Sequence, residues 1–174
     1  MSSYTGDLLW RDYNPESMAF IENWLDSAAV RFTGLDEGFR AFYEYWANEE
    51  GFDAGVNFWC KVIFEDDQPF AVITFCLHGQ KIVIMEIVVA PEKRGCGFGT
   101  KLLKELLERK EILGFVIQES EAVIFPGNLP SQKAFSHAGF QYHHTHEDGS
   151  AMYYVISVGP TKPFPQARQR HFCE

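Results

Sequence analysis

The sequence predicts an α+β fold in which helices flank a mixed, mostly antiparallel sheet. Three observations carry this prediction: two helical segments come first, three strand-like runs joined by short turns follow, and a strand–turn–helix–strand unit comes next. Short turns between strands indicate an antiparallel meander, whereas a helix between two strands indicates a parallel pair. With 174 residues, of which 46% are hydrophobic, the chain can form one domain with a sizeable core.

The first 56 residues are expected to hold two helices. In the segment 15–32, "PESMAFIENWLDSAAVRF", apolar residues recur at helical spacing, with Asn14 as N-cap and Pro15 at the first helical position. A second helix is expected from about Asp36 to Asn48, where aromatic residues form one stripe: Phe39, Phe42, Tyr43 and Trp46. Stripes of this kind usually belong to the core.

Strand-like patterns dominate the middle of the chain. Three runs are rich in β-branched and aromatic residues and are separated by the turn signals "DDQP" and "HGQ"; they span residues 57–65, 70–77 and 81–89. A leucine-rich helix is expected between Gly99 and Gly114, and a strand at 122–125 follows it. This order predicts one βαβ unit within an otherwise antiparallel sheet.

The last elements are a short helix and a hairpin. The helix has Pro130 in its first turn and Gly139 just past its end. Two strand-like runs, 140–146 and 151–158, then flank an Asp-Gly turn, which is a common hairpin signal.

Composition restricts the classes of function. The chain has 24 acidic and 15 basic residues, a net charge of -9, which opposes binding to a nucleic-acid backbone and favours small cationic partners. Acidic residues in the first 30 positions exclude a secretory signal, and the apolar run 82–90 is too short to span a bilayer. We therefore expect a cytoplasmic protein with one domain at 1–158, no membrane contact, and an extended or disordered tail at 159–174.

The cysteines and histidines do not indicate a metal site. The four cysteines form no CxxC pair, which argues against a zinc site and against a disulfide framework. The run "HHTH" at 143–146 places at most two histidines on one face of a strand, so no metal is expected. These histidines instead fit surface packing or a position at a substrate cleft.

The stretch "EKRGCGFGTKLL" places three glycines between a strand and a helix. Glycines at such a turn allow the backbone to approach a ligand and to direct successive N–H groups at it, beside the positive end of the helix. This arrangement is typical of phosphate binding, although a tight turn without a ligand fits the same residues. The pattern is not a Walker loop, because the GxxxxGK[ST] spacing is absent. Cys96 lies between the glycines and is either an acidified thiol or a filler residue.

Two motifs resemble those of the GNAT superfamily of N-acetyltransferases. The first is the acetyl-CoA-binding pattern of an Arg or Gln, two residues, Gly, one residue, and Gly or Ala; the residues that fit are Arg94, Gly97 and Gly99. The second is "GNLPSQKAFSHAGF", in which an Asn begins a short helix that ends in Gly-Phe; the matching residues are Asn128, Ser131, Ala134, Gly139 and Phe140. The resemblance covers roughly residues 57–158, and the helices at 1–56 agree with the family layout in type and order only.

The resemblance implies a GNAT-like sheet that binds acetyl-CoA as cosubstrate. In the family the strands that carry the two motifs splay apart and hold the pantetheine arm, which implies backbone contacts at Ile87, Val88 and Val89. The pyrophosphate would lie on the glycine turn, with contacts at Arg94, Gly95, Cys96, Gly97, Phe98, Gly99 and Thr100. The Arg94 side chain would either pair with a phosphate or lie in solvent. At the second motif the implied contacts are Asn128, Ser131 and Phe135.

Direct acetyl transfer to an amine needs a group that takes a proton from the amine. Glu86 is the candidate, because it is the charged residue within "IVIMEIVV" and stands where certain protein-lysine acetyltransferases of the family place a glutamate. Burial would raise its pKa toward the useful range, whereas a hydrogen-bonded or solvent-facing carboxylate is the alternative. Many relatives supply a Tyr for the leaving thiolate where this chain has Phe135; Tyr142, Ser131 or solvent would then serve.

The sequence leaves the acceptor amine open. The N-terminal helices offer aromatic residues and carboxylates that suit a cation; these are Trp24, Phe32, Asp36, Glu37, Tyr43, Glu44 and Trp46. A polyamine, an aminoglycoside-like drug, an amino acid or an amine of a protein would each fit, and core packing explains most of the aromatic residues equally well.

We expect an acetyl-CoA-dependent N-acetyltransferase that acts on an amine, with a small cationic amine as the favoured acceptor. The alternative is a sensory or regulatory module that binds acetyl-CoA with little catalysis, which Phe135 supports and Glu86 opposes. Family members often dimerise through the last strands, and "AMYYVISV" is apolar enough to allow a homodimer.

Overall fold

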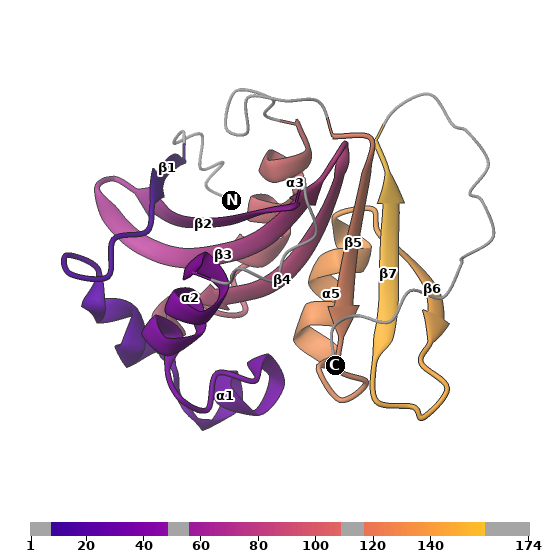
Figure 1. Ribbon diagram of the computed structural model, residues 1–174, viewed down its shortest axis with the longest axis horizontal. Helices are drawn as coiled ribbons and strands as arrows, with labels where there is room; N and C mark the ends of the chain where they lie inside the picture. Colours follow the sequence, from indigo (N-terminus) through magenta and orange to yellow (C-terminus); the bar gives the residue numbers. More distant parts are fainter. Residues whose placement is uncertain (1–7, 49–55, 109–116, 159–174) are drawn as a thin grey trace.

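The computed structural model describes residues 8–48, 56–108 and 117–158 of the chain. Within these residues one sheet is formed by β1 (Leu9–Asp12), β2 (Val56–Glu65), β3 (Gln68–His78), β4 (Lys81–Val89), β5 (Glu119–Ile124), β6 (Gln141–Thr145) and β7 (Met152–Ser157). The order across the sheet is β1-β2-β3-β4-β5-β7-β6, and every neighbouring pair is antiparallel except the parallel pair β4 and β5. This mixed sheet confirms the predicted α+β fold (Figure 1).

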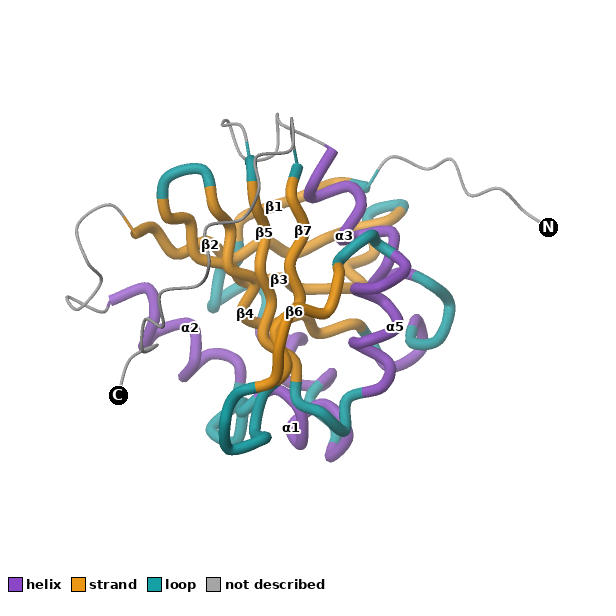
Figure 2. Tube along the Cα trace, turned by 90° about the vertical axis from the view of Figure 1, so that its right-hand side faces the viewer, coloured by secondary structure: helices purple, strands orange, loops and turns teal. Residues whose placement is uncertain are grey.

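The helices lie on both faces of the sheet. They are the 3₁₀ helices η1 (Ala19–Trp24) and η2 (Pro91–Lys93) and the α-helices α1 (Ser27–Thr33), α2 (Phe39–Asn48), α3 (Phe98–Glu108) and α5 (Leu129–His137). Figure 2 shows α3 and α5 on one side of the strands and α2 on the other. The expected end of the α3 helix at Gly114 and the predicted tail at 159–174 lie outside the described residues.

The predicted first helix, 15–32, is two separate elements, η1 and α1. The break occurs at Asp26, whose Oδ1 accepts a hydrogen bond of 2.9 Å from the N–H of Ala29 and so caps α1. Contrary to the prediction, Asn14 does not cap a helix. Its Oδ1 instead accepts hydrogen bonds within a turn, from the N–H groups of Glu16 and Ser17.

Two further N-terminal features differ from the prediction. The second helix begins at Phe39 and not at Asp36, because Gly38 has a φ of +94° and the Glu22 carboxylate accepts hydrogen bonds of 3.0 and 2.7 Å from the N–H groups of Phe39 and Arg40. The short edge strand β1 was not predicted; its four residues show no alternation of buried and exposed side chains.

The sheet separates two hydrophobic clusters. On the face that α3 and α5 cover, here called the α3/α5 face, the cluster includes Ile63, Phe75, Leu102, Leu106, Phe135 and Phe140. On the opposite face, here called the N-terminal face, η1 and α2 pack against the strands, and the cluster includes Ile21, Trp24, Phe39, Val62, Val72 and Val88. The strand β4 contributes to both clusters, so its middle lies between the two halves of the core.

The parallel strands β4 and β5 pair over only part of their length. Their register runs from Lys81 opposite Glu119 to Ile84 opposite Ala122, and no pairing continues beyond this point, although β4 extends to Val89. Figure 1 shows the two strands side by side where they begin and apart where they end. The backbone of the second half of β4 therefore has no partner strand on its β5 side.

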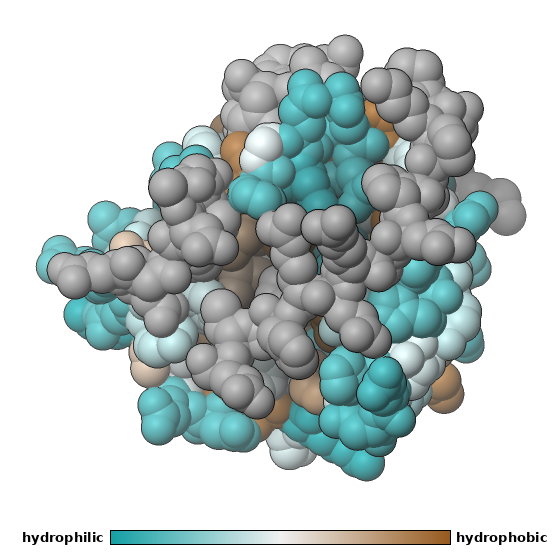
Figure 3. Space-filling model, turned by 45° about the vertical axis from the view of Figure 1, so that its right-hand side comes forward, coloured by the Kyte–Doolittle hydropathy of each residue, from teal (hydrophilic) through white to brown (hydrophobic). Residues whose placement is uncertain are grey.

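Figure 3 shows a mainly hydrophilic side of the molecule, with hydrophobic areas that are small and scattered between polar residues. None of the helices described is long and apolar enough to cross a membrane.

Candidate active site

A β-bulge changes the direction of β4 at the point where β5 leaves it. Thr74 of β3 lies opposite Glu86, whereas the next residue, Phe75, lies opposite Ile84, so that Met85 is the extra residue of the bulge. The N–H of Glu86 donates a hydrogen bond of 3.1 Å to the Oγ1 of Thr74, which is fully buried. A side chain thus replaces the main-chain acceptor that the irregular register takes away.

Beyond the bulge, the backbone groups of β4 alternate between β3 and the open side. The N–H of Glu86 and the N–H of Ala90 both donate to β3 acceptors, the latter to the carbonyl of Phe70 at 2.7 Å. Successive residues of a strand direct their backbone groups to opposite sides. The odd-numbered residues between them therefore face the side that β5 has left.

This alternation divides the predicted pantetheine contacts. Ile87 and Val89 direct their backbone groups to the open side, whereas Val88 directs its groups to β3 and places its side chain in the cluster of the N-terminal face. A ligand that lies along the open edge of β4 would meet Ile87 and Val89. The contact of Val88 with the cosubstrate stays a prediction.

The glycine loop has the backbone that its sequence predicts. Gly95 and Gly97 adopt φ angles of +72° and +82°, which are strained for other residues. In the described part of the chain, the backbone N–H groups of residues 95–100 donate no hydrogen bond, although α3 begins at Phe98. Free N–H groups at the start of a helix, together with the positive end of the helix dipole, favour a bound anion.

The second motif lies against the first. Asn128 is the N-cap of α5, since its Oδ1 accepts a hydrogen bond of 3.2 Å from the N–H of Ser131. The Thr100 hydroxyl in the first turn of α3 lies 3.4 Å from the carbonyl of Ala134, in the second half of α5, so the two helices are in contact. The start of α3, which follows the glycine loop, therefore lies against the helix that Asn128 caps.

Glu86 lies on the N-terminal face of the sheet, because the bulge places its side chain on the same face as that of Val88. The carboxyl group is partly buried and has no hydrogen-bond or ion-pair partner among the residues described. Burial raises the pKa of Glu86 well above its ordinary value. A carboxylate in such an environment is a stronger proton acceptor than an exposed one.

Arg94 turns away from the glycine loop toward the N-terminal elements. Its Nη1 lies 2.5 Å from the Oδ2 of Asp26, its Nη2 donates to the carbonyl of Trp24 at 2.6 Å, and its Nε donates to the carbonyl of Val89 at 2.9 Å. The Arg94 side chain is therefore not simply exposed to solvent, which was one of the two predicted alternatives. A contact between Arg94 and a phosphate stays a prediction.

The groups predicted near the leaving thiolate are not gathered at Glu86. Phe135 is 5% exposed and packs edge-on against Phe140, with ring centroids 4.9 Å apart. Tyr142 is exposed on the edge strand β6, where its hydroxyl lies 2.9 Å from that of Thr145, and two strands separate β6 from β4. The roles of Phe135 and Tyr142 stay predictions.

The histidine run differs from the strict alternation that the sequence suggested. A register shift makes His143 the extra residue of a bulge in β6, so its ring contacts that of His144, with 2.7 Å between the two Nδ1 atoms. His146 lies 2.9 Å from Asp148. Across residues 8–48, 56–108 and 117–158, no three His, Cys, Asp or Glu side chains are arranged to hold a metal.

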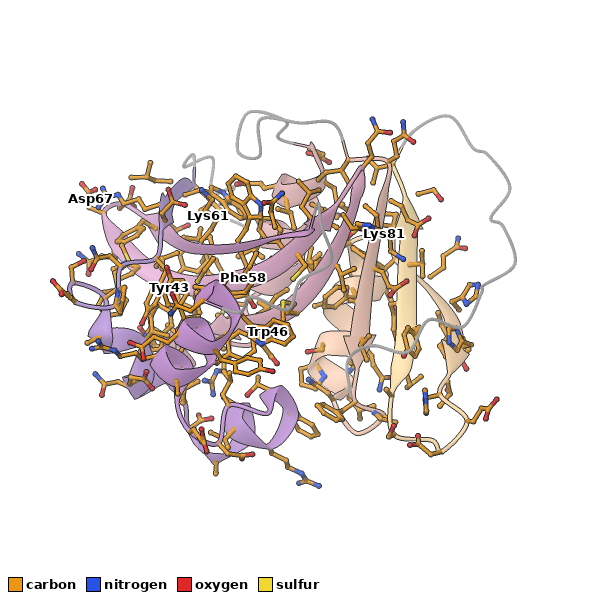
Figure 4. The ribbon with its side chains drawn as sticks, in the orientation of Figure 1. Tyr43, Trp46, Phe58, Lys61, Asp67 and Lys81 are labelled. Atoms are coloured by element: carbon orange, nitrogen blue, oxygen red, sulfur yellow. The ribbon has the colours of Figure 1, made fainter. Side chains whose placement is uncertain are left out.

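The aromatic residues predicted to shape the acceptor site divide into two groups. Tyr43 packs between Tyr13 and Phe58, with ring centroids 4.7 and 6.0 Å apart, and Trp24 is buried, as core packing predicts. Figure 4 shows Tyr43, Phe58 and Trp46 gathered where α2 crosses the sheet. Phe32 of α1 instead reaches the β5–α5 loop, where a Cβ on Gly127 would lie 3.3 Å from its ring.

Two contributing residues were missed by the sequence reasoning. Thr74 holds the Glu86 backbone, and Asp26 links α1 to Arg94. A threonine in a strand and an aspartate before a helix are ordinary at the level of sequence. Only the register of β3 and β4 and the folding of the N-terminal elements onto β4 give these residues their positions.

The chain belongs to the acetyltransferase (GNAT) family, whose model matches residues 10–140. It is similar to L-2,4-diaminobutyric acid acetyltransferases of two bacteria. With that of Virgibacillus pantothenticus it shares 34% identity over 87 residues, which cover 44% of this chain and 54% of the relative. With that of Oceanobacillus iheyensis it shares 32% identity over 89 residues, which cover 44% and 48%. The chain thus spans about half the length of these curated relatives.

A solved structure shows the same fold. Aminoglycoside acetyltransferase AAC(6')-Ib in complex with coenzyme A and kanamycin matches with a TM-score of 0.67 and 19% identity, over 87% of this chain and 95% of that chain. At this level of identity, the likeness concerns the fold alone.

Proposed function

We propose that the protein is an N-acetyltransferase that moves an acetyl group from acetyl-CoA to the primary amine of a small cationic acceptor. One observation carries the proposal: within residues 86–100 the chain presents a buried carboxyl group, an open strand edge and a loop of free N–H groups. The membership of the GNAT family supports the same activity.

The cosubstrate would lie along these groups in order. The N–H groups of residues 95–100 would hold the pyrophosphate, and the backbone of Ile87 and the N–H of Val89, whose carbonyl already accepts from Arg94, would pair with the pantetheine arm. The side-chain amide of Asn128, whose oxygen already caps α5, has an N–H₂ group for a pantetheine carbonyl. The thioester would then lie near the bulge.

The transfer is a direct attack of the amine on the thioester. An ammonium group with a pKa near 10 is only ~0.1% neutral at pH 7, so its proton must pass to Glu86, directly or through water. The amine nitrogen then forms a bond to the carbonyl carbon, and the C–S bond breaks. Coenzyme A leaves as a thiolate, which takes a proton from solvent or from a nearby hydroxyl. No step needs a metal.

The buried charge favours catalysis over a purely sensory role. A carboxylate that is removed from water without a partner destabilises the fold, and such groups are found mostly where function needs them. Because Glu86 has no partner within the described residues, a module that only bound acetyl-CoA would carry this cost without a gain.

A small cationic acceptor is supported by three features. The net charge is -9, the N-terminal elements contain aromatic residues and carboxylates, and the curated relatives are named for a diamino acid. We propose a compact diamine such as L-2,4-diaminobutyrate ahead of an aminoglycoside. A cytoplasmic location and a homodimer belong to the same proposal.

The test is the release of coenzyme A, followed with a thiol reagent, from acetyl-CoA and a panel of amines. The panel holds L-2,4-diaminobutyrate, a polyamine, an aminoglycoside, single amino acids and a lysine peptide, and mass spectrometry identifies the acetylated product. We expect release that depends on the amine and is fastest with a small diamine. Binding of acetyl-CoA without release would favour the sensory module, and absence of binding would overturn both functions.

A further inference from the structure

The helix α1 is held at its ends and not by a core of its own. It has seven residues, none of which is buried, so the hydrophobic cluster below it contributes little to its position. A helix of this length is not stable by itself in water. The position of α1 must therefore be fixed by the contacts at its two ends.

At the start of α1, one carboxylate serves two purposes. The Oδ1 of Asp26 accepts the N–H of Ala29 and caps the helix, while its Oδ2 lies 2.5 Å from the Nη1 of Arg94. Arg94 also donates to the carbonyl of Trp24, the last residue of η1, at 2.6 Å. The residue that precedes the glycine loop thus holds both the end of η1 and the start of α1.

Arg94 is itself held in a fixed direction by β4. Its Nε donates to the carbonyl of Val89, the last residue of that strand. With one donor on β4 and two on the N-terminal elements, the guanidinium bridges two parts of the fold that are 70 residues apart in sequence. The planar fork of arginine can make these contacts together, whereas a lysine ammonium on a flexible stem cannot.

The other end of α1 lies beside the second motif. Phe32 is so close to Gly127 that a Cβ at Gly127 would lie 3.3 Å from the ring, and Gly127 immediately precedes Asn128. Consequently α1 runs from the residue that begins the glycine loop to the loop that carries Asn128. It also contacts β4, the strand that carries Glu86.

We infer that Arg94 is a positioning residue for the acceptor amine: through Asp26 it fixes α1 as a wall of the acceptor site, and it does not bind the phosphates of the cosubstrate. This inference rests on the proposed function, because it takes the acceptor amine to lie beside Glu86 and α1. It assigns the Arg of the first motif to the acceptor side, which is neither of the two roles, a phosphate contact or a solvent-exposed side chain, that the sequence left open.

The experiment compares Arg94→Lys with Asp26→Asn. Asparagine caps helices as well as aspartate does, so Asp26→Asn removes the charged partner of Arg94 and keeps the cap. Arg11→Gln is the matched control, because Arg11 forms an exposed ion pair of 3.3 Å with Asp67, at a distance from α1 along the sheet. Steady-state kinetics give KM for the amine, and calorimetry gives Kd for acetyl-CoA.

We expect both variants to raise KM for the amine about tenfold or more, since small misplacements of a positioning element have effects of this size. The Kd for acetyl-CoA should stay within about twofold of the wild-type value, and the double variant should be no worse than the single ones, as expected for two residues of one interaction. A weaker affinity for acetyl-CoA in Arg94→Lys but not in Asp26→Asn would overturn the inference and make Arg94 a phosphate ligand.

A second measurement separates this inference from the proposed function. Hydrogen exchange of the substrate-free protein reports the stability of α1 whatever the protein catalyses. Both variants should speed the exchange of amides at 30–33, while those of α2 and the Arg11→Gln control should not change. Unchanged exchange in α1 would contradict the inference even if the protein proved to be an acetyltransferase. Faster exchange in α1, in a protein that transfers no acetyl group, would refute the proposed function but not the role of Arg94 in holding α1.

Discussion

Among the residues that the structure describes, the buried and half-buried charged side chains have partners, except that of Glu86. Lys61 is 8% exposed and lies 2.6 Å from Asp12, and Glu65, equally buried, lies 3.3 Å from Lys93. The half-buried Lys81 lies between two glutamates of β5 (Figure 4). Among the residues described, the Glu86 carboxyl is thus set apart by its surroundings as well as by its position on β4.

Glu86→Gln should lower the rate of transfer at neutral pH by about 10² or more, the usual range for loss of a general base. In the wild type, kcat/KM should rise with pH through the raised pKa of Glu86, because only the carboxylate accepts the proton. The variant should lose this rise and recover part of its rate at high pH, where more amine is neutral. Glu16→Gln, at an exposed site, is the control; equal pH profiles for wild type and Glu86→Gln would exclude the assignment.

The same substitution should stabilise the fold. The folded-state pKa of Glu86 is raised above the ordinary value of 4.5, so the free energy of unfolding falls as the pH rises from that value through the raised pKa. Glutamine carries no charge and avoids this loss. Thermal unfolding at pH 8 should give a higher Tm for Glu86→Gln than for the wild type, and the difference should shrink toward pH 4. A lower Tm at pH 8 would mean that the carboxylate is satisfied in the folded protein.

Thr74 should affect the reaction through Glu86. Thr74→Val keeps the shape of a fully buried side chain but removes the acceptor of the Glu86 N–H, whereas Thr74→Ser keeps it. We expect Thr74→Val to reduce kcat about tenfold and to move the pH profile, with Thr74→Ser close to the wild type. A loss of stability without any shift of the pH profile would reduce Thr74 to a structural residue.

At the scale of the elements, the sequence was most informative where periodicity is strong. The strands β2, β3 and β4 begin and end within one or two residues of the predicted runs, because their alternating or continuous apolar patterns are bounded by turn residues. The break between η1 and α1 was missed, since the apolar spacing continues through it and the deciding bond is the cap at Asp26.

The bulge of β4 could not be predicted from the sequence either. The run "IVIMEIVV" has no glycine or proline to mark it, and Met85 becomes the extra residue only because of its pairing with β3. The open edge of β4 at Ile87 and Val89 depends on the same bulge. The first motif therefore predicted a strand and a cosubstrate. The face of the sheet on which Glu86 lies could be assigned only from the register between β3 and β4.

The contact between α1 and the β5–α5 loop should be sensitive to one methyl group. Gly127→Ala would place a Cβ 3.3 Å from the ring of Phe32, which must then move by a few tenths of an ångström. We expect Gly127→Ala to raise KM for the amine. Adding Phe32→Leu in the same chain should relieve the crowding and bring KM part of the way back to the wild-type value. Additive effects of the two substitutions, measured as a double-mutant cycle, would show that the two residues are not coupled.

At the scale of the whole molecule, the position of β4 between two clusters explains how one site can serve two substrates. The α3/α5 side provides the glycine loop and Asn128, the N-terminal face provides Glu86, and α1 contacts β4 itself. Element order predicted the fold, and the resemblance of two motifs indicated the family. The contribution of the N-terminal elements to the site instead depends on long-range contacts such as that between Arg94 and Trp24.

The most direct test of the central claim is a calorimetric titration with acetyl-CoA of the wild type, Gly97→Ala and Gly79→Ala. Both glycines have positive φ angles, +82° and +62°, with open space around them, so alanine adds a similar backbone strain of about 1–2 kcal/mol at each. Only Gly97 lies in the loop of free N–H groups, whereas Gly79 lies in the turn between β3 and β4. We predict binding by the wild type and by Gly79→Ala with equal Kd, and binding about tenfold or more weaker by Gly97→Ala. No binding by the wild type, or equal weakening by the two substitutions, would contradict the claim that this loop holds acetyl-CoA.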